Sequence, residues 1–438
     1  MIKVGVDDLF ESYYPFNADN FSARTIISSI YDTLLSENQN SLPISPIAYF
    51  MWKSENTIKL EFTGRKWSNG EEICANHLEQ TFYYILEKNL KCASLLNFIT
   101  GVKEIKKNAA KKPKLGIKCT KYNMTITTEY PIDAKKILNS ILLTPMYFKN
   151  NLPTFMISSG KYKIKDIKQD YVMVENNFHY YIQDVTKKIL KFFLVGNCNN
   201  ILKLFENSEI DITPSTFYKR SLLDRFVANN LSTKKIIKDS NIDIFFELKQ
   251  FDLELKKYIE KRLSSYSGLI SETKRCSNYF FKVENKMFND SIQYDYIPRE
   301  LNIIFPNYYP NSKIVSAISR KNIDKVISYN FSDYIKYGLK MNYDIALRLT
   351  RLFVGDFLDR ILTYISFVGE THLESYLALV NSINYNNPSI SDINQMNDFL
   401  EHYSRIVPFG KVIHYCILSE KAKDFYIDDN DLYQYERL

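Results

Sequence analysis

The stretch from residue 57 to residue 90 constrains the fold more than any other part of the sequence. Residues 57–62, TIKLEF, alternate apolar and polar side chains, which is typical of a half-buried β-strand. Ser68-Asn69-Gly70 follows, and an Asn-Gly pair supplies the positive φ that tight turns require. Residues 75–90 then repeat apolar residues every three or four positions, which indicates an amphipathic helix. A strand, a turn and a helix in this order favour an α/β structure.

The rest of the chain continues this mixture of strands and helices. Ser22 offers an N-cap to a helix over residues 23–35. Strand patterns cover residues 2–6, 125–128, 161–167, 170–176, 187–195, 209–215, 242–249, 300–305, 342–349 and 406–418. Further helix patterns cover residues 201–206, 252–267, 313–319, 372–383 and 391–406. Because strands and helices do not alternate strictly, we expect α/β lobes with mixed sheets.

The composition is that of a folded chain without a membrane span. Of its 438 residues 45% are hydrophobic, which is enough for a sizeable core and indicates two or three domains. No run of eighteen apolar residues occurs, so we expect no transmembrane helix. The six cysteines are scattered without a CxxC pair, and the first residues show no leader pattern. Both features favour the cytoplasm for the chain as it stands, and a leader removed from a longer precursor is also compatible with them.

The net charge of +7 does not indicate a nucleic-acid partner. The clearest basic run lies between residues 103 and 118, in a polar segment between two apolar ones. Nucleic-acid binding calls for basic residues interleaved with exposed aromatic ones or placed on a recognition helix. We therefore expect a solvated loop here, with a phosphate-binding patch as the less favoured alternative.

No sequence pattern of a catalytic or metal site is present. The five histidines show neither HExxH nor HxH spacing. The sequence also lacks a GxSxG elbow, a Walker loop and a GxGxxG motif. We therefore expect no enzymatic activity, no cofactor and no bound metal.

Four segments in collinear order carry a resemblance to a known family. Residues 2–35 pass from a strand through a Pro-containing loop to SSIYDTLL, and residues 52–86 read WKSENTIKLEFTGRKWSNGEEICANHLEQTFYYIL. SSGKYKIKDIKQDYVMVENNFHYY and ENSEIDI follow, and then YDIALRL and RIVPFGKVIHYCIL. In this order the segments resemble family 5 of the bacterial extracellular solute-binding proteins. This family is the peptide- and nickel-binding group that supplies ABC transporters.

The resemblance implies a two-lobed fold of the periplasmic-binding-protein type (type II, similar to cluster C), with mixed sheets. Lobe I would span residues 1–241, with an extra subdomain inserted at about 45–150, and a shortened lobe II would span residues 242–405. Residues 406–438 would return to lobe I. The outward crossing is expected near Ile242–Leu248 and the return crossing near Ile406–Ile417. In such folds the ligand lies between lobes that close over it by a hinge motion.

The resemblance also implies ligand contacts from loops at the ends of several lobe I strands. Short hydroxyl and amide side chains in such places suit hydrogen bonding to a peptide backbone. The same residue types are typical of turns and helix N-caps, and both roles remain open. The lobe I candidates are Asn20, Phe21, Ser22, Ser159, Ser215 and Thr216.

Lobe II departs from the peptide-binding members, which carry an Asp for the α-amino group of the peptide. Counting from Asp344, the family's Trp falls on Thr350 and its Asp on Phe353, which cannot neutralise an ammonium. Either the ligand has no free amino terminus here, or another carboxylate such as Asp356 supplies the charge. The aromatic candidates could instead be core residues, and the arginine a solvated one. The lobe II candidates are Phe331, Thr350, Arg351, Phe353 and Asp356.

Two functions are compatible with the resemblance. In the first, the protein is a monomer that captures a peptide or peptide-like small molecule for the permease and ATPase subunits of an ABC importer. The family default for that function is the periplasm or the cell surface. In the second, the same fold serves as a cytosolic ligand-sensing or accessory module beside a regulator or a biosynthetic enzyme. The leaderless start, the six cysteines and the shortened lobe II motivate this second possibility.

Overall fold

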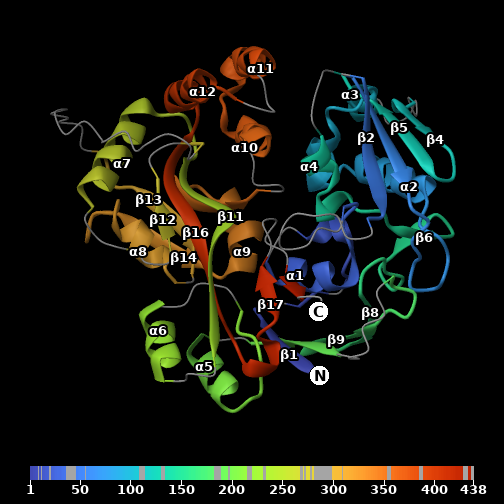
Figure 1. Ribbon diagram of the computed structural model, residues 1–438. Coiled ribbons are helices and arrows are strands. Elements are labelled where there is room, and N and C mark those ends of the chain that lie inside the picture. Colours follow the sequence, from blue (N-terminus) through green and yellow to red (C-terminus); the bar gives the residue numbers. More distant parts are fainter. Residues whose placement is uncertain are drawn as a thin grey trace. The chain divides into compact units, whose positions relative to one another are not determined.

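The helices and strands of the chain fall into two units in a computed structural model (Figure 1). Unit 1 comprises Met1–Pro214, Ser232–Lys234 and Cys416–Leu438, and unit 2 comprises Ser215–Leu231 and Lys235–Tyr415. The main segments of the two units therefore meet at 234/235 and 415/416. From the sequence, the lobe boundaries were predicted at 241/242 and 405/406. The structure describes residues 1–7, 9–10, 12–18, 21–35, 46–54, 56–107, 114–129, 134–181, 189–195, 198–214, 220–229, 233–266, 270, 273–276, 279–280, 298–307, 309–352, 357–383, 388–427 and 433–435.

One four-stranded sheet of unit 1 has the order β1-β10-β9-β8. The strands β1 and β10 run parallel, while β9 pairs antiparallel with both β10 and β8. Their buried residues alternate with less buried ones, as predicted for half-buried strands. The strands are β1 (Ile2–Val6), β8 (Tyr162–Ile167), β9 (Tyr171–Asn176) and β10 (Leu190–Leu194).

A second sheet of unit 1, in the order β2-β3-β5-β4, contains the strand predicted at residues 57–62. Trp67 is fully buried beside the predicted turn, where Gly70 has a φ of +92° and its N–H donates to the Trp67 carbonyl at 2.9 Å. The helix α2 then packs against β4. These elements are β2 (Ala48–Ser54), β3 (Thr57–Phe62), β4 (Ile117–Cys119), β5 (Asn123–Thr127) and α2 (Ala75–Glu87).

The other elements of unit 1 are short helices and two hairpins. β6 pairs with β7 and β17 with β18, both antiparallel. No helix among the described residues is long and apolar enough to cross a membrane. These elements are α1 (Phe21–Ile30), α3 (Val102–Lys107), α4 (Lys135–Leu138), β6 (Tyr147–Lys149), β7 (Leu152–Thr154), α5 (Cys198–Glu206), β17 (Phe425–Ile427) and β18 (Tyr433–Tyr435).

The helix predicted at residues 23–35 is wrong at both ends. α1 begins at Phe21, so Ser22 lies inside it, and the last helical hydrogen bond is from the Tyr31 N–H to the Ile27 carbonyl. Beyond this point the backbone bonds to distant parts of unit 1. The Asp32 N–H donates to the Ser159 Oγ and the Leu35 N–H to the Asn139 Oδ1. These tertiary partners replace the next helical turn.

Unit 2 is built on a six-stranded mixed sheet in the order β12-β16-β11-β15-β13-β14. β13 pairs parallel with β14 and with β15, while β15 pairs antiparallel with β11. The predicted strand at 242–249 is the second half of a longer strand. The strands are β11 (Lys234–Leu248), β12 (Thr273–Arg275), β13 (Asn302–Pro306), β14 (Lys325–Tyr329), β15 (Ile345–Arg351) and β16 (Ile406–Leu418).

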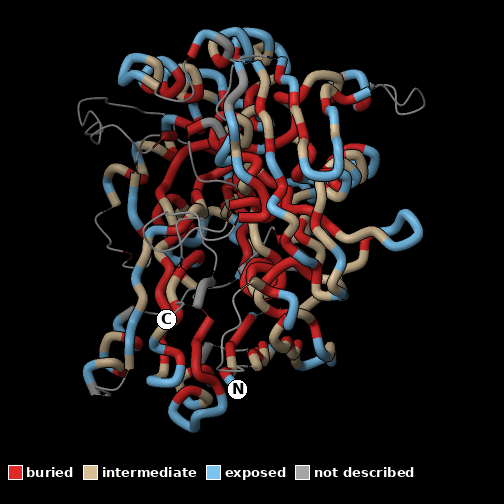
Figure 2. Tube along the Cα trace, turned by 45° about the vertical axis from the view of Figure 1, so that its right-hand side comes forward, coloured by how far each residue is buried: buried red, intermediate tan, exposed pale blue. Residues whose placement is uncertain are grey.

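Helices cover both faces of this sheet, so its central strands are buried on either side. Ile244, Phe246 and Leu248 of β11 pack with α7 and α8, whereas Phe245 packs with α10, α11 and α12. Figure 2 shows the buried residues following the strands and the exposed ones gathering in the turns and on outer helix faces. The helices are α6 (Arg220–Asn229), α7 (Leu253–Ser265), α8 (Asn311–Ser316), α9 (Phe331–Lys336), α10 (Phe357–Tyr364), α11 (Leu373–Ser382) and α12 (Ile390–Tyr403).

The close packing of Gly160 against the end of α1 generates the first prediction. A Cβ at Gly160 would lie 2.7 Å from the carbonyl carbon of Ile30 and 2.8 Å from the amide nitrogen of Tyr31. Overpacking of this kind costs about 1–3 kcal/mol, so Gly160→Ala should lower the urea midpoint followed by far-UV circular dichroism. Gly369→Ala is the control, because its Cβ would come no closer than 3.8 Å to its neighbours. Equal midpoints for both variants would contradict this packing.

Candidate functional site

The side chains of Ser22 and Ser159 make their described contacts inside unit 1. Ser22 is buried near the start of α1, and its Oγ accepts the Asp7 N–H at 3.1 Å. Phe21 is the first residue of the same helix. Ser22 therefore ties the end of β1 to α1. Asn20, Ser215 and Thr216 lie outside the described residues.

Ser159 lies at the other end of α1. It is fully buried, its Oγ accepts the Asp32 N–H at 3.3 Å, and the neighbouring Gly160 N–H donates to the Ile30 carbonyl at 2.9 Å. A helix rises about 1.5 Å per residue, so the backbone positions of Ser22 and Ile30 are about 12 Å apart. The structure therefore does not bring Ser22 and Ser159 into one site.

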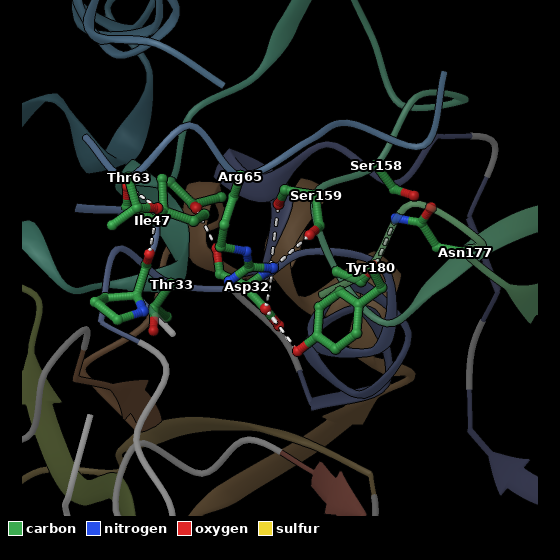
Figure 3. A network of polar contacts seen from close by, with 12 residues as sticks. Asp32, Thr33, Ile47, Thr63, Arg65, Ser158, Ser159, Asn177 and Tyr180 are labelled. Carbon is green, nitrogen blue, oxygen red and sulfur yellow. Dashed lines mark hydrogen bonds and ion pairs between the residues drawn. The ribbon is translucent and has the colours of Figure 1, made fainter. Parts of the chain in front are cut away.

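A buried network that the sequence did not reveal surrounds Ser159 (Figure 3). The Arg65 Nη2 donates to the Asp32 Oδ2 at 2.7 Å and to the Ser159 carbonyl at 2.9 Å. The Tyr180 hydroxyl donates to the same Asp32 oxygen at 2.8 Å, and the guanidinium lies 5.0 Å from the Tyr180 ring centroid and 4.6 Å from that of Tyr181. This charge-compensated network fixes four chain segments to one another.

Three strands of unit 2 end at the same edge of the sheet. Because β13, β14 and β15 run parallel, their carboxyl ends lie side by side. Phe331 begins α9 two residues after β14, and Thr350 and Arg351 are the last residues of β15. The structure thus places these three candidates on one edge, which is where ligands bind in open α/β sheets. Phe353 and Asp356 lie outside the described residues.

A buried ion pair that sequence analysis missed lies next to this edge. Asp243 of β11 is the register partner of Thr350. The Arg360 Nε and Nη2 donate to its two carboxylate oxygens at 3.0 and 3.2 Å, and the Tyr364 hydroxyl donates at 2.8 Å. Burial lowers the pKa of Arg360 and the Asp243 carboxylate raises it, with a net upward shift. The pair fixes α10 to β11.

A second buried carboxylate accounts for Arg348. Glu247, the last residue but one of β11, lies 3.4 Å from the Arg348 Nε and 3.2 Å from the Arg405 Nη1. Arg348 lies on β15, three residues before Arg351. The structure shows it to be a partner of Glu247, on the same face of the sheet as Asp243.

The described residues offer no arrangement for metal chemistry. Within the parts of the chain that the structure covers, no three His, Cys, Asp or Glu side chains gather closely enough to hold a metal ion. His77, on the helix after the Asn-Gly turn, is packed between the rings of Trp67 and Tyr147. Its pKa is lowered by burial, and the nearby Glu71 carboxylate opposes this shift.

The family of the protein follows from a match to a family model. Residues 45–290 match the model for the bacterial extracellular solute-binding proteins, family 5 (middle), which is more than half of the chain. The protein belongs to this family. The predicted family is thus confirmed, whereas a comparison with curated proteins returns no match.

Solved structures with the fold of this family match along the whole chain. OppA of Haemophilus influenzae, in complex with RPPGFSPFR, has a TM-score of 0.80 at 13% identity, covering 99% of this chain and 99% of that chain. The murein tripeptide binding protein MppA of Escherichia coli has a TM-score of 0.79 at 12% identity, covering 100% and 98%. NikA from Staphylococcus aureus, in complex with Ni(L-His)2, has a TM-score of 0.73 at 12% identity, covering 99% and 98%.

At these identities the matches show the fold. The predicted fold class, a two-lobed α/β fold of the periplasmic-binding-protein type with mixed sheets, is confirmed. The family and these structural relatives are binding proteins by description, not enzymes.

The network around Asp32 generates a prediction for this solute-binding protein. Arg65→Met should lower the free energy of unfolding by about 3–5 kcal/mol, because it leaves the buried carboxylate without its cation. Urea unfolding followed by the fluorescence of Trp52 and Trp67 measures this loss. Lys121→Met is the control, since its ion pair with Glu72 is exposed to solvent and should contribute little to stability. A smaller loss for Arg65→Met than for the control would contradict the role given to the network.

The ion pair of unit 2 generates a third prediction. Asp243→Asn keeps the shape of the side chain but removes the buried carboxylate to which Arg360 donates two hydrogen bonds, so unfolding should become easier by about 3–5 kcal/mol. Far-UV circular dichroism during urea unfolding measures the change. Lys274→Met removes an exposed ion pair with Asp239 on the same sheet and should change stability by less than about 1 kcal/mol. If both variants unfolded alike, Asp243 and Arg360 would not form the buried pair described.

Proposed function

We propose that this protein captures a peptide or a peptide-like small molecule and delivers it to an ABC importer. Family membership carries the proposal, because more than half of the chain matches a family of extracellular solute-binding proteins. The complex of Haemophilus influenzae OppA with RPPGFSPFR supports a peptide as the ligand, and the murein tripeptide binding protein supports a short one.

On unit 2 we assign ligand contact to the carboxyl edge of β14, β13 and β15. Parallel strands direct their last residues and the following loops to this edge, and α/β proteins generally bind ligands there. Thr350 offers a hydroxyl and Arg351 a guanidinium at the end of β15. Phe331 begins the helix after β14, and Phe353 and Asp356 follow β15 in the sequence.

On unit 1 the candidates divide into two groups. Ser22 and Ser159 already use their hydroxyl groups within the unit, so we assign them to the positioning of neighbouring loops. The proposal leaves direct ligand contact to Asn20 and Phe21 of unit 1 and to Ser215 and Thr216, which belong to unit 2. Amide, hydroxyl and aromatic groups of this kind suit a peptide backbone and its apolar side chains.

The proposal includes no chemical step. Next to the carboxyl edge, Arg360 and Tyr364 both donate hydrogen bonds to Asp243, an arrangement that fixes neighbouring elements and suits a binding site. The family description supports an extracellular location, and the permease and ATPase subunits of an importer would be the partners.

Ligand-dependent stabilisation tests the proposed function. A ligand that binds only the folded protein, present at a hundred times its Kd, stabilises it by about 2.7 kcal/mol. Thermal unfolding should therefore shift upward with members of a library of short peptides, amino-acid conjugates and metal chelates. No shift with any member would contradict the proposal. Neighbouring permease and ATPase genes would support import, while a neighbouring regulator or biosynthetic cluster would support the sensor function instead.

A further inference from the structure

At the carboxyl edge of the unit 2 sheet, β15 extends beyond the end of its neighbour β13. β15 is paired with β13 at Ile304 and Ala346, and β13 ends two residues later at Pro306. β15 continues to Arg351, so its last three residues extend past the end of β13. Successive residues of a strand point to opposite faces, so Thr350 and Arg351 present a hydroxyl on one face and a guanidinium on the other.

The described carboxylates near this extension are held by cations of unit 2. Asp243, directly opposite Thr350, accepts both donors of Arg360 and the hydroxyl of Tyr364. Asp239, four residues earlier on β11, accepts the Lys274 Nζ at 2.7 Å. An ammonium group of a ligand would have to compete with these cations for either carboxylate.

Two lysines lie side by side on the neighbouring strands β12 and β16 of this sheet. Lys411 of β16 is the register partner of Lys274 on β12. Burial lowers the pKa of Lys411, and the charges of Arg360 and Lys274 lower it further, against the opposing effect of Asp243 and Asp239. Burial is the largest of these effects, and the two cations and two carboxylates around Lys411 act on its pKa in opposite directions.

From this arrangement we infer that the carboxyl edge of β14, β13 and β15 binds a carboxylate of the ligand rather than an ammonium group. The inference rests on the proposed function and narrows its ligand class to molecules that present an acid to unit 2. The guanidinium of Arg351 suits this role, because its planar donors match the two oxygens of a carboxylate. A peptide with a blocked amino terminus meets this requirement as well as a peptide with a free amino terminus does.

The test offers the purified protein four pools of tripeptides in equal amounts. One pool without Asp or Glu is used in a free, an N-acetylated and a C-amidated form, and a fourth pool is C-amidated but carries one Glu. Native mass spectrometry measures how much of each pool is bound. We expect the N-acetylated form to bind as well as the free form and at least tenfold more than the Glu-free amidated form. Binding of the Glu pool would show that a side-chain carboxylate can take the place of the terminal carboxylate.

Arg351→Gln is the decisive variant. It should reduce the preference for the N-acetylated form over the Glu-free amidated form by at least tenfold. Lys325→Gln is the matched control, because it removes one cation from the amino end of β14, at the opposite edge of the same sheet. This control should leave the preference unchanged. Circular dichroism verifies that both variants are folded.

The outcomes separate this inference from the proposed function. A preference for the Glu-free amidated form, or equal binding of the N-acetylated and Glu-free amidated forms, would overturn the inference while leaving peptide capture intact. If Asp356→Asn abolished a preference for the amidated form, Asp356 would be the partner of a ligand ammonium. If Arg351→Gln kept the preference for the N-acetylated over the Glu-free amidated form, Arg351 would not be the group that binds the carboxylate. Binding of no pool at all would count against peptide capture itself.

Discussion

Unit 2 depends on the pairing of β11 with β16, the strands on which the chain enters and leaves it. The Leu248 N–H donates to the Arg405 carbonyl at 2.7 Å, and the Ser240 Oγ donates to the Val412 carbonyl at 2.9 Å, so the strands run in opposite directions. Side chains of β11 fill a different hydrophobic cluster on each face. A slip of one residue would exchange the two faces and move the carboxylate of Asp243 into the wrong cluster.

Buried charges fix this register more sharply than apolar packing does. Asp243 and Glu247 lie on the same face of β11, and each has its own arginine partners from other elements. Apolar side chains of similar size can replace one another, but an unpaired carboxylate in this core would cost several kcal/mol. The ion pairs therefore hold α10 and β15 at one position along β11. The same contacts determine the charge that unit 2 presents at its carboxyl edge.

Unit 1 uses a comparable device for joining distant segments. Asp211 accepts the Lys3 N–H through its Oδ2 and the Ser419 hydroxyl through its Oδ1, which joins the first strand to the end of the chain. The predicted strand at residues 209–215 contributes one bridging residue, Ile212, between Val4 and Leu418. The contacts among Asp32, Arg65 and Ser159 join three further segments in the same way. In each case single polar contacts join the segments, in place of a long series of hydrogen bonds between paired strands.

The sequence by itself determined the elements whose side chains follow a period, and it determined the family. The alternation at residues 57–62, the Asn-Gly turn and the apolar run at 242–249 report on local backbone preference and burial, which are properties of neighbouring residues. It also pointed to Phe331, Thr350 and Arg351, which the parallel strands bring to one edge. Only the tertiary structure decided that α1 ends at Ile30 and that Asp243 is neutralised by Arg360. Their partners lie more than a hundred residues away, so no local pattern encodes them.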